Sequence, residues 1–92
     1  FKDLSKEEIE EIFTGYNKIV VNMDTNIVDL LIHMGIASSK REAREYVTGN
    51  AIAINGIKIS DLEYVISDKD FLDNTYMIIK RGKKNYYIGI NK

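Results

Sequence analysis

The sequence predicts a small α+β domain in which three short helices pack on a small, mostly antiparallel sheet. Helix-start signals followed by apolar residues at helical spacing occur three times before residue 50. Two hairpin patterns follow, one around an Asn-Gly pair and one around a basic Gly-Lys-Lys turn. With 92 residues, the chain is long enough for one small domain.

The first predicted helix spans about residues 6–13. Ser5 and Glu8 have the spacing of a capping box, and Leu4 and Ile9 have that of a hydrophobic staple. Residues 19–21 are apolar and form either a short strand or an apolar anchor. We therefore expect residues 1–24 to be a connecting segment with a short acidic helix, and residues 25–92 to form the main domain with a basic C-terminal hairpin.

Two further helices are predicted in the main domain. The first begins at Thr25 or Asn26, ends near Gly35, and carries a buried stripe at helical spacing that comprises Ile27, Leu30, Leu31 and Met34. The next begins with a second predicted capping box, Ser39 and Glu42, and ends at Gly49. On a helical wheel its basic residues occupy one arc, beside the apolar positions and away from the acids; they are Lys40, Arg41 and Arg44.

Both hairpins are predicted from turn residues and strand alternation. Residues 51–54 and 57–60 flank Asn55-Gly56, so four isoleucines share one buried face, namely Ile52, Ile54, Ile57 and Ile59. The other face carries small residues and Lys58. The second hairpin pairs residues 75–81 with 85–90, and a short strand is expected at 64–66. Alternation sends Tyr86 and Tyr87 to opposite faces, so that one joins the core and the other is free to stack on a base.

Positive charge is concentrated in the second part of the chain. Residues 1–35 carry three Lys and seven acidic residues, whereas residues 36–92 carry ten basic and seven acidic residues. Local basic patches attract phosphates even where the net charge of the chain is near zero. We define the basic shelf as Lys40, Arg41, Arg44 and Lys58, and the basic turn as Lys80 to Lys84. Solvated surface charge remains the alternative interpretation of both.

Several classes of function are excluded or disfavoured. The chain has no Cys and a single His, so common zinc sites cannot form. His33 lies off the apolar stripe, which indicates an exposed helix position. No catalytic or metal-binding residue is predicted, no cofactor is expected in this chain, and no apolar run approaches the ~20 residues that span a bilayer. The absence of an initiator Met suggests a piece of a longer protein.

Residues 26–59 resemble the alpha-L RNA-binding motif, first associated with small-subunit ribosomal protein four. The matching segments are Gly35-Ile36-Ala37-Ser38-Ser39, Lys40-Arg41-Glu42-Ala43-Arg44, Gly49 and Ile54-Asn55-Gly56. Lys40 precedes Arg41 and Ile54 replaces a Val, which are mild departures. The flanking segment Leu4-Ser5-Lys6-Glu7-Glu8-Ile9-Glu10-Glu11-Ile12-Phe13 resembles the segment that joins the catalytic body of bacterial tyrosyl-tRNA synthetases to their C-terminal domain. Near the end of the chain, Lys80-Arg81-Gly82-Lys83-Lys84-Asn85-Tyr86-Tyr87 resembles the closing hairpin of that family.

This resemblance implies a tRNA-binding domain that grips the anticodon stem and long variable arm of tyrosine tRNA. The parent would be a cytoplasmic, homodimeric tyrosine–tRNA ligase that uses ATP, with Mg, whereas the isolated domain would be monomeric and non-catalytic. The expected RNA-binding residues are Ser39, Lys40, Arg41, Arg44, Lys58, Arg81, Lys83, Lys84 and Tyr86. Two alternatives stay open: a ribosome- or rRNA-associated protein with the same motif, and a protein–protein docking module.

Overall fold

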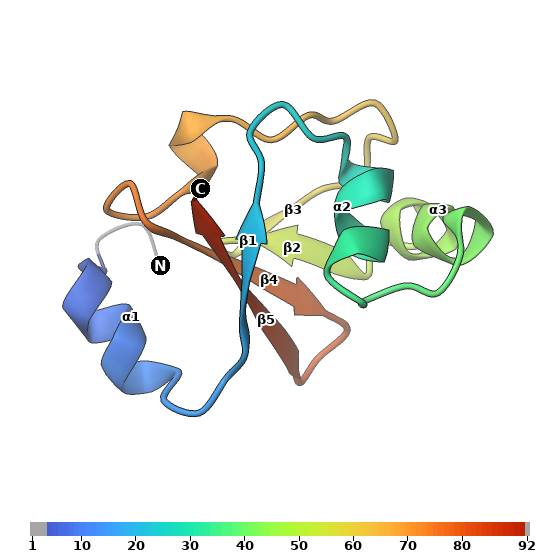
Figure 1. Ribbon diagram of the computed structural model, residues 1–92. Coiled ribbons are helices and arrows are strands. Elements are labelled where there is room, and N and C mark those ends of the chain that lie inside the picture. Colours follow the sequence, from blue (N-terminus) through green and yellow to red (C-terminus); the bar gives the residue numbers. More distant parts are fainter. Residues whose placement is uncertain (1–3, 92) are drawn as a thin grey trace.

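The computed structural model describes residues 4–91 and consists of three α-helices, a five-stranded sheet and one short 3-10 helix (Figure 1). The elements follow the order α1 (Lys6–Ile12), β1 (Lys18–Val21), α2 (Ile27–His33), α3 (Lys40–Thr48), β2 (Ile52–Ile54), β3 (Ile57–Lys58), η1 (Asp68–Asp70), β4 (Tyr76–Arg81) and β5 (Asn85–Asn91). The predicted α+β class and the three helices are confirmed.

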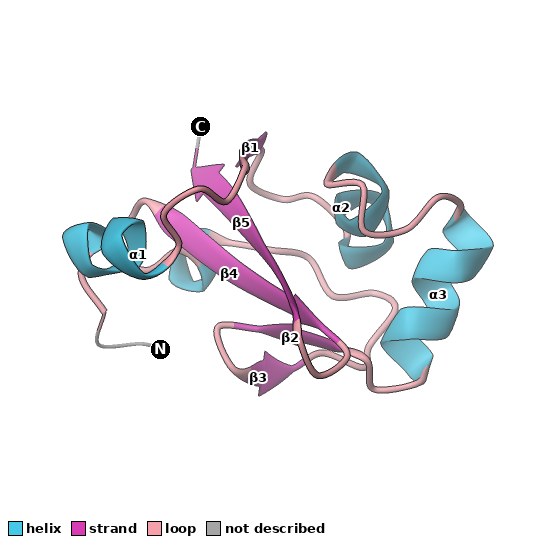
Figure 2. Cartoon of the chain, turned by 90° about the horizontal axis from the view of Figure 1, so that it is seen from below, coloured by secondary structure: helices cyan, strands magenta, loops and turns pink. Residues whose placement is uncertain are grey.

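The strands lie in the order β1-β5-β4-β2-β3. The pairs β2–β3, β2–β4 and β4–β5 are antiparallel, and β1 pairs in parallel with β5. The sheet is therefore mostly antiparallel, as predicted. The apolar run at residues 19–21, which the sequence left undecided, forms an edge strand of this sheet. Figure 2 shows α1 and the pair α2/α3 on opposite sides of the sheet.

Helix α1 covers one face of the sheet, which we call the α1 side. Ser5 and Glu8 form the predicted capping box, with Ser5 Oγ accepting from Glu8 N and Glu8 Oε1 accepting from Ser5 N. These bonds lower the pKa of Glu8. The helix contributes to a small core cluster of Ile9, Phe13, Leu72, Tyr76, Ile78 and Ile88. Segment 4–24 thus packs on the same sheet as the rest of the chain, and the expected boundary at residue 24 stays a prediction.

Helices α2 and α3 cover the opposite face, which we call the α2/α3 side. The predicted stripe on α2 is buried throughout, and α3 contributes Ala43 and Val47 to the same core as Ile52, Ile54, Met77 and Ile79. Exposed His33, as predicted, faces outward and places Nε2 2.8 Å from the Val20 carbonyl oxygen.

The start of α3 differs from the predicted capping box. Ser39 Oγ accepts from Glu42 N at 3.1 Å, but Glu42 Oε1 accepts from the backbone N of Ser38 at 2.8 Å and not from Ser39. Ser39 itself is extended, at φ −153° and ψ 163°. Gly49 ends the helix with φ −84°, and a Cβ there would lie 2.9 Å from the Glu45 carbonyl oxygen.

The Asn55-Gly56 hairpin is confirmed, with both turn residues at positive φ. Asn55 also joins three segments, because its Nδ2 donates to the Asp70 carbonyl oxygen at 2.7 Å and its Oδ1 accepts from Ile78 N at 2.9 Å. The prediction that all four isoleucines are buried was wrong for Ile57, which is 69% exposed. Strand β3 is a two-residue edge strand, and neither core cluster includes Ile57.

The segment between the two hairpins is mostly irregular. The short strand expected at residues 64–66 is reduced to one isolated bridge between Asn26 and Val65. Tyr64 donates its hydroxyl proton to Asp70 Oδ1 at 2.7 Å, and burial together with this carboxylate raises the pKa of Tyr64 to about 12. The second hairpin forms with the predicted turn, and its six cross-strand pairs run from Tyr76–Ile90 to Arg81–Asn85.

Candidate nucleic-acid interface

The basic residues form two clusters on opposite faces of the sheet. Strand alternation decides their placement, because successive side chains point to opposite faces. Lys80 lies on the α1 side with Ile78, whereas Arg81 lies on the α2/α3 side with Ile79 and Ile52. Lys58 pairs with Ala53 and so also lies on the α1 side. The structure therefore separates Lys58 from the other three residues of the basic shelf.

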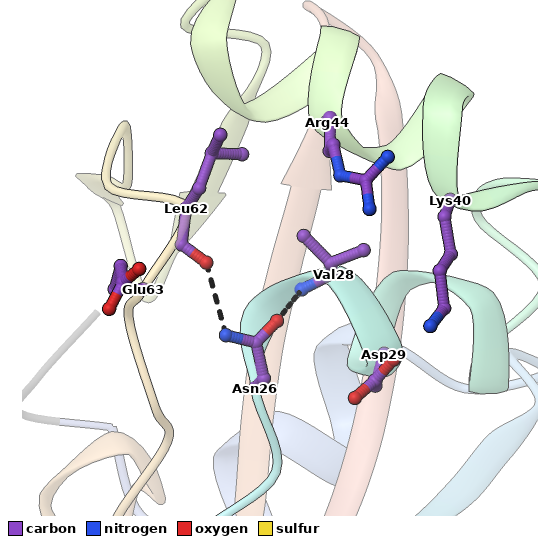
Figure 3. Close-up of a pocket in the computed structure, with 7 residues that line it drawn as sticks. All are labelled: Asn26, Val28, Asp29, Lys40, Arg44, Leu62 and Glu63. Atoms are coloured by element: carbon purple, nitrogen blue, oxygen red, sulfur yellow. Dashed lines mark hydrogen bonds between the residues drawn. The ribbon is translucent and has the colours of Figure 1, made fainter.

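The first cluster is a groove of about 340 Å³ beside α2 and α3, which we call the helical groove (Figure 3). Lys40 and Arg44 enter it from successive turns of α3, as the four-residue spacing predicts. Both side chains are exposed. Their charges point over the N-terminal turn of α2, as Figure 3 shows. This arrangement offers two cations side by side to an anionic backbone.

The Asn26 side chain helps to hold the opposite wall of the helical groove, beside a backbone hydrogen bond from Ile27 N to the Tyr64 carbonyl oxygen. Asn26 caps α2, its Oδ1 accepting from Val28 N at 2.8 Å, and its Nδ2 donates to the Leu62 carbonyl oxygen at 3.0 Å (Figure 3). Asn26 thereby fixes residues 62–63 beside α2. This wall also brings two carboxylates, Asp29 and Glu63, into the groove. The groove therefore carries charges of both signs. A phosphate would be most stable at a position closer to Lys40 and Arg44 than to Asp29 and Glu63.

The other predicted residues of α3 flank the helical groove. Arg41 is exposed and follows Lys40 by about 100° around the helix axis. Ser39 uses its hydroxyl oxygen to cap α3, so its hydroxyl proton is the group left to meet a ligand. The α3 residues of the basic shelf thus form one continuous basic surface along the helix.

The second cluster is a shallow cavity of about 190 Å³ on the α1 side, which we call the open sheet face. A cross-strand row crosses it from β3 to β5, in the order Lys58, Ala53, Lys80 and Tyr86. Helix α1 covers the neighbouring part of this face, around Ile78 and Ile88, and its C-terminal Phe13 meets this row only at Tyr86.

Arg81 is placed differently from the other predicted site residues. Its Nη1 donates to the Ile36 carbonyl oxygen and to the Tyr46 hydroxyl, both at 3.4 Å, and the guanidinium lies 5.4 Å from the centre of the Tyr46 ring. Arg81 thus joins β4 to α3 and to the loop before it. Its position indicates that it orients the basic surface of α3.

The remaining predicted residues lie near the tip of the second hairpin. Lys83 and Lys84 are exposed in the turn, with Gly82 at φ +68°. Tyr86 is half-buried, with its ring centre 5.9 Å from that of Phe13 and the Lys80 ammonium 5.7 Å above its centre. Tyr87 packs against the larger core instead. The two tyrosines lie on opposite faces as predicted, but Tyr86 also packs against the smaller core cluster and is not free of contacts. Contact of any of these residues with RNA stays a prediction.

Sequence reasoning placed Lys80 in the basic turn but not on one face with Lys58, and it missed Asn26, Asp29 and Glu63 as parts of the site. The signal for Lys80 was available, since a three-residue turn at 82–84 pairs Lys80 with Tyr86 and places them on one face. No comparable signal existed for the two acids, because the contact between α2 and residues 62–63 depends on tertiary packing.

Within residues 4–91, no group of three or more His, Cys, Asp or Glu side chains is placed to hold a metal ion. No helix in that range is long and apolar enough to cross a membrane. The geometry is that of a binding surface with two cationic clusters.

Comparison with known proteins agrees with this geometry. Residues 8–89 match the family model described as the tyrosine–tRNA ligase SYY-like C-terminal domain. A tyrosine–tRNA ligase of Staphylococcus carnosus is 48% identical over 88 residues, and one of Streptococcus pneumoniae is 46% identical over 89; each alignment covers 95% of this chain and 21% of the relative. The chain therefore spans about a fifth of the length of these curated relatives.

A solved structure has the same fold. The solution structure of a tyrosyl-tRNA synthetase C-terminal domain superposes with a TM-score of 0.77 at 34% sequence identity, covering 97% of this chain and 91% of the other. The alignment thus spans nearly all of this chain and most of the other.

Proposed function

The chain belongs to the family of C-terminal domains of tyrosine–tRNA ligases, and on that premise we propose that it grips the anticodon stem and long variable arm of tyrosine tRNA. The observation that supports this most directly is the helical groove, where Lys40 and Arg44 lie side by side on a rigid helix. An A-form stem is recognised mainly through its phosphates and 2′-hydroxyls, and two spaced cations with a nearby serine hydroxyl suit that recognition.

The domain contributes affinity and orientation, and it makes or breaks no bond. The rest of the ligase, which the relatives' length implies, supplies the sites for ATP with Mg and for tyrosine. We propose a cytoplasmic, homodimeric parent in which this domain, a monomer by itself, holds the tRNA while its acceptor end reaches the distant catalytic site.

The binding should depend strongly on salt. If five or six exposed cations each neutralise one phosphate, the logarithm of the association constant falls with the logarithm of salt concentration with a slope on the order of −4. The six candidates are Lys40, Arg41, Arg44, Lys58, Lys83 and Lys84.

The test is a fluorescence titration of the 92-residue chain with tyrosine tRNA, a tRNA with a short variable arm, and a ribosomal RNA hairpin. We expect the tightest binding for tyrosine tRNA and a steep salt slope. Equal affinity for all three RNAs would contradict the tRNA assignment and favour a general RNA-binding role. Absence of RNA binding would favour the docking alternative.

A further inference from the structure

The open sheet face combines two lysines with small residues between them, and binding the phosphates of an RNA stem would not require those small residues. Its centre is Ala53, flanked on β3 by Lys58 and on β4 by Lys80. Neighbouring strands lie about 4.8 Å apart, so the backbones of the two lysines are separated by about 10 Å across the alanine. Two ammonium groups therefore border a floor that has almost no side-chain bulk.

The floor is flat because its residues are small. Ala51 just before β2, Ala53 on β2 and Gly82 in the hairpin turn line it, and the Gly82 backbone N donates to the Ala51 carbonyl oxygen at 2.8 Å. The cavity of about 190 Å³ is smaller than the roughly 300–1,000 Å³ of sites for drug-sized ligands. It has room for one flat ring, whereas the stacked and paired bases of a duplex cannot enter it.

One of the two cations is held in place before any ligand arrives. The Lys80 ammonium lies 5.7 Å from the centre of the Tyr86 ring, and the Phe13 ring packs against that tyrosine at 5.9 Å. A cation over an aromatic face is stabilised by the ring quadrupole. Helix α1, which carries Phe13 at its C-terminal end, thus supports the tyrosine that positions Lys80.

We propose that the open sheet face binds a single unstacked nucleotide of a single-stranded RNA segment, with its base on the Ala51/Ala53/Gly82 floor and its two flanking phosphates on Lys58 and Lys80. The inference rests on the proposed RNA-binding function and adds a second subsite to it. The helical groove holds the stem on the α2/α3 side, and the open sheet face holds an unpaired nucleotide on the α1 side. An acidic peptide matches the charges but not the flat floor.

The test uses the 92-residue chain and the tetranucleotide UUUU, with binding followed by NMR shifts of labelled backbone amides. We expect shifts at Ala51, Ala53, Lys58, Lys80 and Gly82. For a single strand each phosphate contact contributes a log–log salt slope of about −0.7, so the wild type should give about −1.4. Lys80→Gln should halve that slope and weaken binding about fivefold at 0.1 M salt, since 0.1 raised to −0.7 is about five.

The matched control is Lys69→Gln, which removes an exposed lysine of η1 outside both clusters. Equal UUUU affinity of Lys80→Gln and Lys69→Gln would overturn the inference, as would shifts confined to α3. Displacement of UUUU by a tetraglutamate peptide of equal affinity would also overturn it in favour of a peptide site. A failure of this inference can be told apart from a failure of the proposed function, because binding of tyrosine tRNA by the wild type tests the proposed function alone.

Discussion

Replacement of Arg44 by glutamine is the sharpest test of the helical groove. The Arg44 side chain is exposed and enters the groove beside Lys40. Among residues 4–91, the hydrogen bond that joins Arg44 to another side chain runs from Thr48 Oγ1 to the Arg44 backbone oxygen at 2.9 Å. The substitution thus removes a charge without removing that bond. Surface changes of this kind usually alter the free energy of unfolding by less than about 0.5 kcal/mol. For a domain of this size that corresponds to a change in melting temperature of less than about 4 °C.

The expected loss of RNA affinity follows from the release of counterions. One phosphate contact on a duplex contributes a log–log salt slope of about −0.9, so its loss weakens binding about eightfold at 0.1 M salt and reduces the slope by about 0.9. Arg44→Glu should weaken binding further, because it adds a third carboxylate to a groove that already holds Asp29 and Glu63.

The assay is a titration of labelled tyrosine tRNA at four salt concentrations between 0.05 and 0.4 M. Across this range the Debye length falls to several ångströms, so screening of exposed charges increases strongly. Lys69→Gln serves as the matched control for net charge. The reasoning is refuted if Arg44→Gln and Lys69→Gln share one affinity and one salt slope while both melt like the wild type. A parallel loss of melting temperature in Arg44→Gln would instead show that the side chain supports the fold.

Three further outcomes follow from the tertiary contacts. Arg81→Met removes the hydrogen bonds from β4 to Ile36 and Tyr46, so it should lower the melting temperature and weaken tRNA binding without changing the salt slope. A slope reduced by about 0.9 would mean that Arg81 itself contacts a phosphate. Asn55→Ala should lower the free energy of unfolding in urea by about 3 kcal/mol, because it leaves two hydrogen-bond partners unbonded and keeps a non-glycine residue at φ 52°. Asn55→Gly is free of the backbone strain and should lower it by less. Equal losses for the two variants would contradict a contribution from strain. Tyr64 keeps its proton in the folded state up to a pKa of about 12, whereas an unfolded tyrosine loses it near 10. The contribution of Tyr64 to stability should therefore be constant below about pH 10 and fall as pH rises toward 12. Tyr64→Phe should lack this part of the decline in urea unfolding, and an identical alkaline profile would exclude the hydrogen bond to Asp70 as its cause.

Most local signals in the sequence were reliable where one short segment determines its own conformation, although the Ser39–Glu42 capping box formed only in part. The Ser5 capping box, the α2 stripe and both hairpin turns need only neighbouring residues, and the structure confirms all of them. Predictions of burial were less reliable, because they depend on which helix or loop covers each face of the sheet. Ile57 pairs with buried Ile54 and so shares its face of the sheet, as predicted. It is nevertheless exposed, because it lies on an edge strand outside both core clusters.

The candidate site divides in the same way. The spacing of Lys40 and Arg44 predicts two cations on one side of a helix, and the groove confirms that they lie together. The acids that oppose them come from α2 and from residues 62–63, which only packing brings to α3. Whether these groups bind RNA stays a prediction, which the titrations above decide.

The amino-acid sequence by itself determined the helices, the turns, the family and the residues that carry positive charge, because each depends on short-range pattern. Only the tertiary structure decided which cations act together. Strand order and alternation placed Lys58 with Lys80 on the α1 side, turned Arg81 inward to α3, and left Lys40 and Arg44 in the helical groove. The physical reason is that a side chain's face is fixed by local alternation, whereas its neighbours on that face come from strands that pair across the whole chain.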